Sequence, residues 1–152
     1  MKIITKNKRA YFDYEILERF KAGMVLMGTE VKSIKTGHIS LKGSYVVIDE
    51  NQEAWLIGAK IPAYQPKNAP KDYVPSRSRK LLLKKPEIRY LIGKSKQKGL
   101  TLVPLMVYTE KGKIKLEFGV AKGKRKIDKR EAIKKREFER EKSRILKNNL
   151  SS

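Results

Sequence analysis

The strongest constraint on the fold is a strict alternation of apolar and other residues in the segment 113–121. Its large apolar side chains recur at every second position, at Ile114, Leu116, Phe118 and Val120. Successive side chains of a strand point to opposite faces of a sheet. This period of two therefore predicts a half-buried strand with these four residues on its core face.

The composition changes abruptly after this segment. Residues 122–152 contain 13 lysines and arginines against five acidic residues, a net charge of +8. We therefore expect a folded domain over residues 1–121, large enough to bury a core, and a basic tail over residues 122–152.

The whole chain is strongly basic, with 37 Lys and Arg, 16 Asp and Glu, and a formal net charge of +21. The predicted domain without its tail still carries +13. Positive charge on both parts favours a polyanionic partner, and nucleic acid is the first candidate. An anionic membrane is the second, but no long apolar run or lipidation signal supports it.

The chain contains no cysteine, which excludes disulfides and thiolate metal sites. Its first residues lack the apolar core of a secretory signal peptide, so the expected location is the cytoplasm.

A helix is expected over residues 14–22, because Ile16 and Phe20 have helical spacing between Asp13 as N-cap and Gly23 as terminator. The residues before it read as basic and irregular. The compact apolar run that follows Gly23, Met24 to Met27, is expected to be a buried strand.

Two further helices are expected over residues 28–37 and from Pro86 to Gly99. In the first, Thr29 would provide the cap and Glu30 would point outward in the first turn.

Two hairpins are expected, one from strands 45–48 and 54–57, the other from strands 100–108 and 113–121. Pro104 predicts an edge position or a bulge in the strand 100–108. No strands alternate with long helices as in a parallel sheet, so we expect a mainly β fold, a small closed β-barrel with short helices.

The segment 62–79 contains four prolines among basic residues and is expected to be a long loop. Tyr64 and Tyr73 in this loop suit either stacking on unpaired bases or packing against the barrel. On the strand 113–121, Lys113 and Lys115 suit either phosphate contacts or a solvated strand face.

A flexible cationic hinge joins the domain to the tail, although its residues also fit a purely solubilising segment. They are Lys122, Lys124, Arg125 and Lys126. These binding features do not distinguish RNA from DNA.

The tail has a helical signature but few apolar residues. Asp128 and Glu131 form a capping box, whereas Ile127, Phe138 and Ile145 are the large apolar side chains aligned on one face. Burial of three such side chains contributes about 5–9 kcal/mol. Ordering about 20 residues costs several times more. We therefore predict a tail that is disordered alone and helical on a partner.

No catalytic constellation is apparent in the sequence. His38 is the single histidine and lies in no motif, and no phosphate-binding loop, metal-ligand cluster or nucleophile elbow is present. We expect a protein that is not an enzyme and that has no catalytic residues, metal or cofactor.

Five motifs occur together in one order: Asn7-Lys8-Arg9-Ala10, Gly28-Thr29-Glu30-Val31-Lys32-Ser33, Arg77-Ser78-Arg79-Lys80-Leu81-Leu82-Leu83, Gly119-Val120-Ala121-Lys122-Gly123-Lys124 and Asp128-Lys129-Arg130. In these motifs the chain resembles the SsrA-binding protein family, also called small protein B (SmpB), over nearly its whole length.

The resemblance implies an oligonucleotide-binding (OB) type barrel that binds the tRNA-like domain of transfer-messenger RNA (SsrA). It also implies delivery of that RNA to stalled ribosomes for trans-translation, the rescue of the ribosome and tagging of the incomplete protein. The tail would probe the small-subunit decoding centre and the empty mRNA channel. Elongation factor Tu and alanyl-tRNA synthetase would be indirect partners through the charged RNA.

The resemblance and the charge pattern together predict two groups of contact residues. The RNA-binding group is Asn7, Lys21, Glu30, Lys32, Tyr45, Leu82, Lys113, Lys115, Lys122 and Lys124. The ribosome-contacting tail group is Arg125, Lys126, Asp128, Lys129, Arg130, Lys134, Lys135, Arg136 and Phe138.

The chain departs from the family pattern at three positions. Lys21 replaces an acid that is common in the family, and Phe12 and Ile127 replace histidines. Two alternatives remain open on the sequence: a general RNA-binding protein without a rescue role, and a nuclease or RNA-modifying enzyme.

Overall fold

The computed structural model describes residues 1–124, and the predicted tail from residue 125 onward lies outside the described residues. The elements are β1 (Lys2–Lys6), α1 (Lys8–Asp13), β2 (Tyr14–Met24), α2 (Gly28–Lys35), β3 (Tyr45–Ile48), β4 (Ala54–Ile57), the 3₁₀ turn η1 (Pro66–Asn68), β5 (Arg79–Leu82), α3 (Lys85–Ser95), β6 (Leu100–Glu110) and β7 (Lys113–Gly123).

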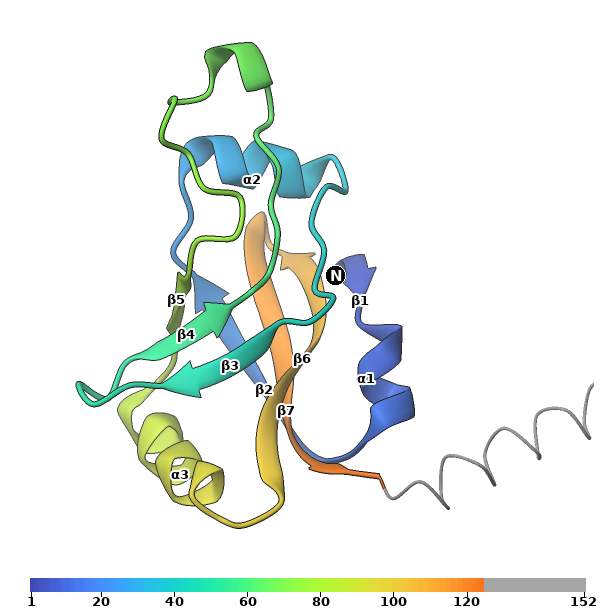
Figure 1. Ribbon diagram of the computed structural model, residues 1–152, viewed down its shortest axis with the longest axis vertical. Coiled ribbons are helices and arrows are strands. Elements are labelled where there is room, and N and C mark those ends of the chain that lie inside the picture. Colours follow the sequence, from blue (N-terminus) through green and yellow to red (C-terminus); the bar gives the residue numbers. More distant parts are fainter. Residues whose placement is uncertain (125–152) are drawn as a thin grey trace, which may run out of the picture.

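The seven strands form one antiparallel sheet in the order β1-β6-β7-β2-β5-β4-β3. The sheet curls on itself, because β3 at one end of this order also contacts β6 near the other end. Figure 1 shows β3 and β4 crossing over the long β6–β7 pair. The predicted class, a mainly β, barrel-like fold with short helices, is confirmed.

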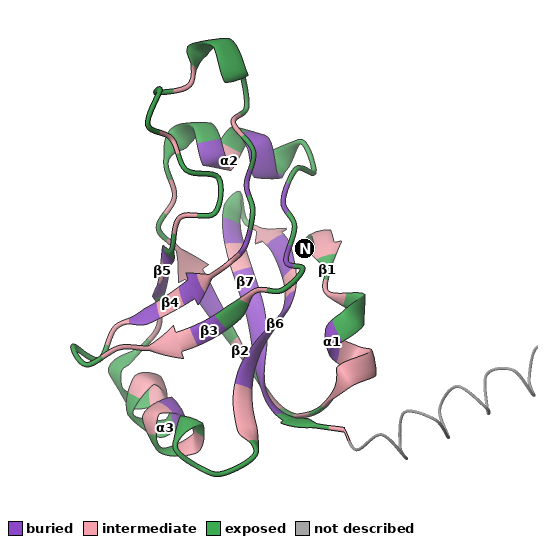
Figure 2. Ribbon diagram, viewed as in Figure 1, coloured by how far each residue is buried: buried purple, intermediate pink, exposed green. Residues whose placement is uncertain are grey.

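The core face predicted for β7 is confirmed, since Ile114, Leu116, Phe118 and Val120 are all buried inside the curled sheet. The opposite face of β7 is only partly exposed. Ala121 on that face packs with Ala10 of α1 in a second, smaller cluster. Strand β7 is therefore half-buried near its start, covered on both faces from Leu116 to Ala121, and exposed at its last two residues (Figure 2).

The helix expected over residues 14–22 is wrong, because this segment is strand β2. It pairs with β7 from Tyr14 to Gly23, and this long-range ladder overrides the local helical spacing. Its exposure alternates along most of its length, as in a strand with one covered face. Only Met24 of the expected strand 24–27 belongs to a strand, the end of β2.

The N-terminal residues were expected to be irregular but form β1 and α1. Strand β1 adds to the edge of β6, and Asn7 then connects α1 to the same strand. The Asn7 backbone N–H donates to the Leu105 carbonyl at 2.7 Å, and its side-chain amide donates to the Pro104 carbonyl at 2.9 Å. The register shift next to Pro104 is the predicted bulge.

The other expected helices and both hairpins are confirmed with shifted ends. Helix α2 is capped at Met27 rather than at Thr29, and α3 ends at Ser95, before Gly99 as expected. Strand β5 was not expected, although it closes the sheet between β2 and β4. The expected domain boundary at residue 121 falls inside β7.

Replacing Gly119 with Ala is expected to destabilise the protein by about 1–3 kcal/mol. A Cβ at this position would lie 2.9 Å from the Glu18 carbonyl oxygen and 2.9 Å from Ile16 Cγ2, closer than packed atoms tolerate. Urea unfolding monitored by circular dichroism measures the change. Gly93→Ala in α3 is the matched control, because open space surrounds its Cβ position and Ala favours a helix by about 0.5–1 kcal/mol. Equal stability of the Gly119 variant and wild type would show that β2 and β7 separate easily.

Candidate nucleic-acid interface

A row of partly exposed residues crosses three neighbouring strands where β5, β2 and β7 meet. Gly23 of β2 pairs with Leu82 of β5 on one side and with Lys115 of β7 on the other. Leu82 is 55% exposed, although it lies within a strand. Because Gly23 has no side chain, it leaves a gap between the apolar Leu82 and the cationic Lys115.

This gap is part of a surface hollow of about 390 Å³, which we call the β7 hollow. Its lining combines apolar side chains with two lysines: Gly23, Met24, Leu26, Val31, Leu82, Gly112, Lys113, Ile114 and Lys115. Apolar side chains can contact the faces of bases and sugars, and lysines can contact phosphates. The β7 hollow thus brings together three of the predicted RNA-binding residues, Leu82, Lys113 and Lys115.

Lys21 extends the positive charge of this face along β2. It is exposed and lies two residues from Gly23, so both positions belong to the same face of the strand. Its Nζ atom is 5.7 Å from the centre of the Tyr108 ring, a cation–π contact. It also pairs across the ladder with Glu117, whose carboxylate lies 3.6 Å from Arg19.

A buried ionic cluster is centred on Glu30 of α2, the residue before Val31 of the β7 hollow. The Glu30 carboxylate accepts hydrogen bonds from the Met27 backbone N–H at 2.9 Å and from Arg79 Nε at 3.0 Å and Nη2 at 2.5 Å. Arg77 pairs with the other carboxylate oxygen. Glu30 and Arg79 are fully buried, so the two charges compensate each other away from water.

The cluster ties the long loop between β4 and β5 to α2. Tyr73 from this loop donates a hydrogen bond to the Ile61 carbonyl at 2.6 Å and approaches Glu30 at 3.3 Å. Arg79 also donates to the Ala59 carbonyl at 2.8 Å. Of the two interpretations open for Tyr73, the structure shows packing. Tyr64 remains 42% exposed.

The pKa of Glu30 follows from these contacts. Burial alone would raise the pKa, but the hydrogen bonds from Arg77, the Met27 N–H and Arg79, together with the Arg79 charge, hold it below the ordinary value of 4.5. Glu30 is therefore a carboxylate at neutral pH.

The prediction that Glu30 points outward is wrong, because its side chain is 1% exposed and enclosed by its partners. Its assignment to the RNA-binding group stays a prediction. Glu30 instead positions α2, which contributes Val31 to the β7 hollow. No local pattern in the sequence indicated this role, since Arg77 and Arg79 lie 47 and 49 residues away.

Comparison with known proteins shows the family of this chain. The model of the family described as SmpB protein matches residues 4–148. The chain belongs to the SmpB protein family. The resemblance seen in the five sequence motifs is thereby confirmed.

Relatives in the SmpB family match nearly the whole chain. A protein named SsrA-binding protein from Thermosynechococcus vestitus is 46% identical over 147 residues, covering 97% of this chain and 96% of the relative. Another SsrA-binding protein, from Cupriavidus necator, is 50% identical and covers 95% of both chains. A solved structure described as "tmRNA-SmpB: a journey to the center of the bacterial ribosome" superimposes with a TM-score of 0.66 at 46% identity, covering 85% of this chain and 93% of that chain.

The remaining predicted RNA-binding residues of this SmpB chain lie outside the β7 hollow. Lys32 is exposed on α2, one residue beyond Val31, and Tyr45 is 47% exposed at the start of β3. Lys122 is exposed near the end of β7, seven residues from Lys115, a distance of about 23 Å along a strand.

Two predicted contact residues have internal roles in this SmpB structure. Lys124 donates from Nζ to the Tyr11 carbonyl at 3.1 Å and from its backbone N–H to the Asp13 carbonyl at 2.9 Å. It thereby fastens the end of β7 to the junction of α1 and β2. The side-chain amide of Asn7 is likewise bound to Pro104. The nine predicted tail contacts, Arg125 to Phe138, lie outside the described residues.

Within residues 1–124 of this SmpB chain, no three His, Cys, Asp or Glu side chains are placed to hold a metal ion. His38 is exposed, and its Nδ1 lies 2.8 Å from Thr36 Oγ1. No helix in the same part of the chain is long and apolar enough to cross a membrane.

Proposed function

We propose that this chain binds the tRNA-like domain of transfer-messenger RNA and delivers the RNA to stalled ribosomes for trans-translation. The observation that carries the proposal is the β7 hollow, which places Leu82 beside Lys113 and Lys115 on an open face. The names of the relatives, SsrA-binding proteins, support transfer-messenger RNA as the ligand. The structure described for tmRNA and SmpB supports the bacterial ribosome as the place of action.

The charged and apolar residues of the β7 hollow have different proposed roles in RNA binding. The lysines contact phosphates, which supplies affinity without reading a sequence. Leu82 and the apolar floor contact a sugar or base exposed in a loop of the RNA, which selects a particular RNA shape. The buried Glu30 cluster holds α2 and the β4–β5 loop in place, so that the hollow has one form before RNA arrives.

The tail completes the proposal. Residues 125–152 would enter the decoding centre and the empty mRNA channel, become helical there, and report that no mRNA is present. The lysines and arginines among the nine predicted contacts would meet rRNA phosphates, and Asp128 would cap the helix. Elongation factor Tu and alanyl-tRNA synthetase would meet the chain only through the charged RNA, in the cytoplasm, and the chain itself would catalyse no reaction.

Competition binding tests the proposal at the level of RNA choice. Labelled transfer-messenger RNA is bound at about 0.15–0.2 M salt, where nonspecific phosphate contacts are weak. We expect unlabelled transfer-messenger RNA to displace it at a concentration at least about tenfold lower than the concentration of ordinary tRNA that is needed. Leu82→Ala should reduce this preference, because it removes the apolar side of the β7 hollow, whereas Lys115→Ala should weaken the binding of both RNAs, because it removes a phosphate contact. Lys67→Ala in the β4–β5 loop is the control for loss of one positive charge outside that hollow.

The second candidate is a general RNA-binding protein, which the net charge of +21 favours. It predicts equal displacement by transfer-messenger RNA and tRNA, with affinity that follows total charge. Equal displacement would overturn the rescue proposal. Turnover of either RNA by the pure protein would instead revive an enzymatic function.

A further inference from the structure

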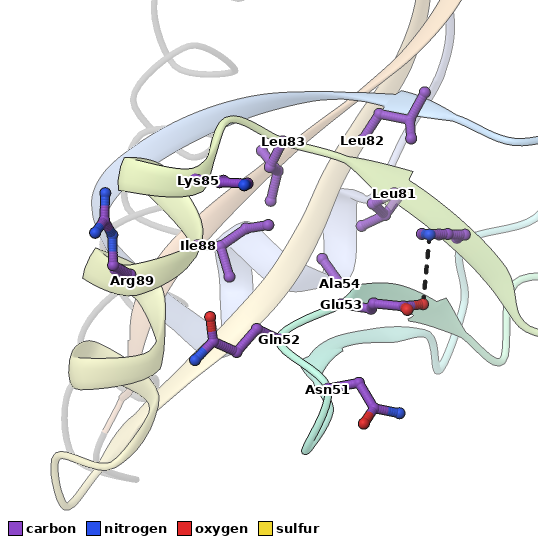
Figure 3. A pocket seen from close by; sticks show the side chains of 11 residues that line it. Asn51, Gln52, Glu53, Ala54, Leu81, Leu82, Leu83, Lys85, Ile88 and Arg89 are labelled. Atoms are coloured by element: carbon purple, nitrogen blue, oxygen red, sulfur yellow. Dashed lines mark ion pairs between the residues drawn. The ribbon is translucent and has the colours of Figure 1, made fainter.

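A second hollow adjoins the β7 hollow. It lies between β5, the turn joining β3 to β4, and the start of α3, and its volume is about 450 Å³. We call it the α3 hollow. Its lining is Asn51, Gln52, Glu53, Ala54, Lys80, Leu81, Leu82, Leu83, Lys85, Ile88 and Arg89. Figure 3 shows Ile88 and Gln52 approaching from opposite sides, with Leu83 between β5 and α3.

The α3 hollow has an apolar floor and a positive rim. Glu53 is the one acidic residue in the lining of the α3 hollow. Its Oε2 atom lies 3.4 Å from Lys80 Nζ, so these two charges compensate each other. Lys85 and Arg89 have no ion pair within the described residues. Both are exposed, one turn apart on α3. The hollow therefore has two positive charges available to an anionic partner.

Leu82 connects the two hollows, because this exposed residue belongs to the lining of both. On one side of Leu82 lie Lys113 and Lys115, and on the other lie Lys85 and Arg89. The two cationic rims thus belong to one continuous surface with an apolar ridge between them. A nucleic-acid strand, in which charged phosphates alternate with the apolar faces of bases, is complementary to such a surface.

We propose that the RNA-binding surface continues across Leu82 into the α3 hollow, which receives an unpaired nucleotide of the same RNA. This inference rests on the proposed function and extends it. The base contacts Leu83 and Ile88, and the flanking phosphates contact Lys85 and Arg89. The side-chain amides of Asn51 and Gln52 carry both donors and acceptors for the edge of the base. A volume of this size is in the range of small-ligand pockets, roughly 300–1,000 Å³.

Charge selects this occupant over others. A second copy of the chain would bring another net charge of +21 to a positive rim and would be repelled. An acidic peptide satisfies the charge, but it makes no use of the continuity with the β7 hollow. An RNA strand uses both features, and an acidic peptide is therefore kept as an outcome of the test.

The first test is the double variant Lys85→Ala/Arg89→Ala in the full-length chain. Its affinity for transfer-messenger RNA is expected to fall about tenfold at about 0.15 M salt. The slope of log affinity against log salt is expected to become shallower by about 1–2, one for each lost phosphate contact. The matched control is Lys96→Ala/Lys98→Ala, which removes the same charge from exposed positions at the other end of α3. The control should change the affinity by no more than about twofold.

The second test locates the RNA directly and does not depend on affinity. Because the chain has no cysteine, Asn51→Cys provides a single attachment point for a photo-crosslinker at the rim of the α3 hollow. Crosslinks are expected at one short run of nucleotides in transfer-messenger RNA. The same label at Lys98→Cys should give none at that run.

The outcomes separate this inference from the proposed function. If Lys115→Ala weakens binding while the Lys85/Arg89 variant and the crosslinker on Asn51→Cys show nothing, the inference is wrong and the proposed function stands. If wild type shows no preference for transfer-messenger RNA, the proposed function fails, and the inference fails with it. A fluorophore on the Asn51→Cys variant that responds to a polyglutamate peptide but not to the RNA would assign the hollow to an acidic protein segment and overturn the inference.

Discussion

Replacing Arg79 with Met is expected to lower the free energy of unfolding by about 3–5 kcal/mol, because it leaves the Glu30 carboxylate buried without the guanidinium that donates two hydrogen bonds to its Oε2 atom. Arg79 and Glu30 are both fully buried, and Arg79 also supports the Ala59 carbonyl. Met fills a similar volume, so the expected loss reports the lost pairing of the buried charge rather than a cavity. Urea unfolding at neutral pH measures it, with the midpoint and the slope compared to exclude a change in the unfolded state.

Two controls test the cause of this loss. Arg9→Met removes a surface pair with Asp13 whose arginine side chain is 73% exposed, and we expect a change of about 0.5 kcal/mol or less. The double variant Glu30→Gln/Arg79→Met removes both charges, so its cost should be well below the sum of the single costs. A loss below about 1 kcal/mol for Arg79→Met alone would show that water or Arg77 compensates Glu30, contrary to the role given to the cluster.

The pH dependence of the same cluster has a defined sign. The pKa of Glu30 is lowered in the folded protein, so its contribution to stability is present above the ordinary value of 4.5 and is lost as the pH falls through the folded pKa. Wild type should therefore lose stability in acid more steeply than Glu30→Gln, which has no proton to bind at this position.

Sequence patterns predicted the elements that have a periodic or local signal in the sequence. The alternation in β7, the two tight hairpins, and the helices α2 and α3 follow from spacing and turn residues alone. Strand β2 was misassigned because Ile16 and Phe20 also satisfy a helical spacing, and only its ladder with β7 decides between the two. The local propensity of a segment contains no information about a paired strand that lies about 100 residues away in the sequence.

For the candidate site, too, the sequence predicted individual residues but not their arrangement in space. Leu82 and Lys115 were predicted, but their meeting around Gly23 depends on the register of three strands. Glu30 was predicted with the wrong orientation, because its partners Arg77 and Arg79 come from the far side of a long loop. The α3 hollow had no sequence signal, since its lining comes from a turn, a strand and a helix that are brought together only by the fold.

Truncation after Lys126 is expected to abolish tagging of incomplete proteins while leaving the affinity for transfer-messenger RNA within about threefold of wild type. The removed residues 127–152 contain nine lysines and arginines and five acidic residues, a net charge of only +4 out of +21. Both hollows and the Glu30 cluster lie before this point. A reconstituted translation reaction on an mRNA without a stop codon measures tagging, and competition binding measures the RNA affinity.

A scrambled tail of identical composition separates charge from helix formation. Scrambling keeps the +4 but breaks the capping box of Asp128 and Glu131 and the alignment of Ile127 with Phe138. If a helix on the ribosome is required, the scrambled chain binds RNA and fails to tag, as the truncated chain does. Tagging restored by the scrambled tail would mean that positive charge near the rRNA is sufficient and that the helix has no role. Normal tagging by the truncated chain itself would show that the tail does not report the empty mRNA channel, and that this task belongs to the barrel or to the RNA.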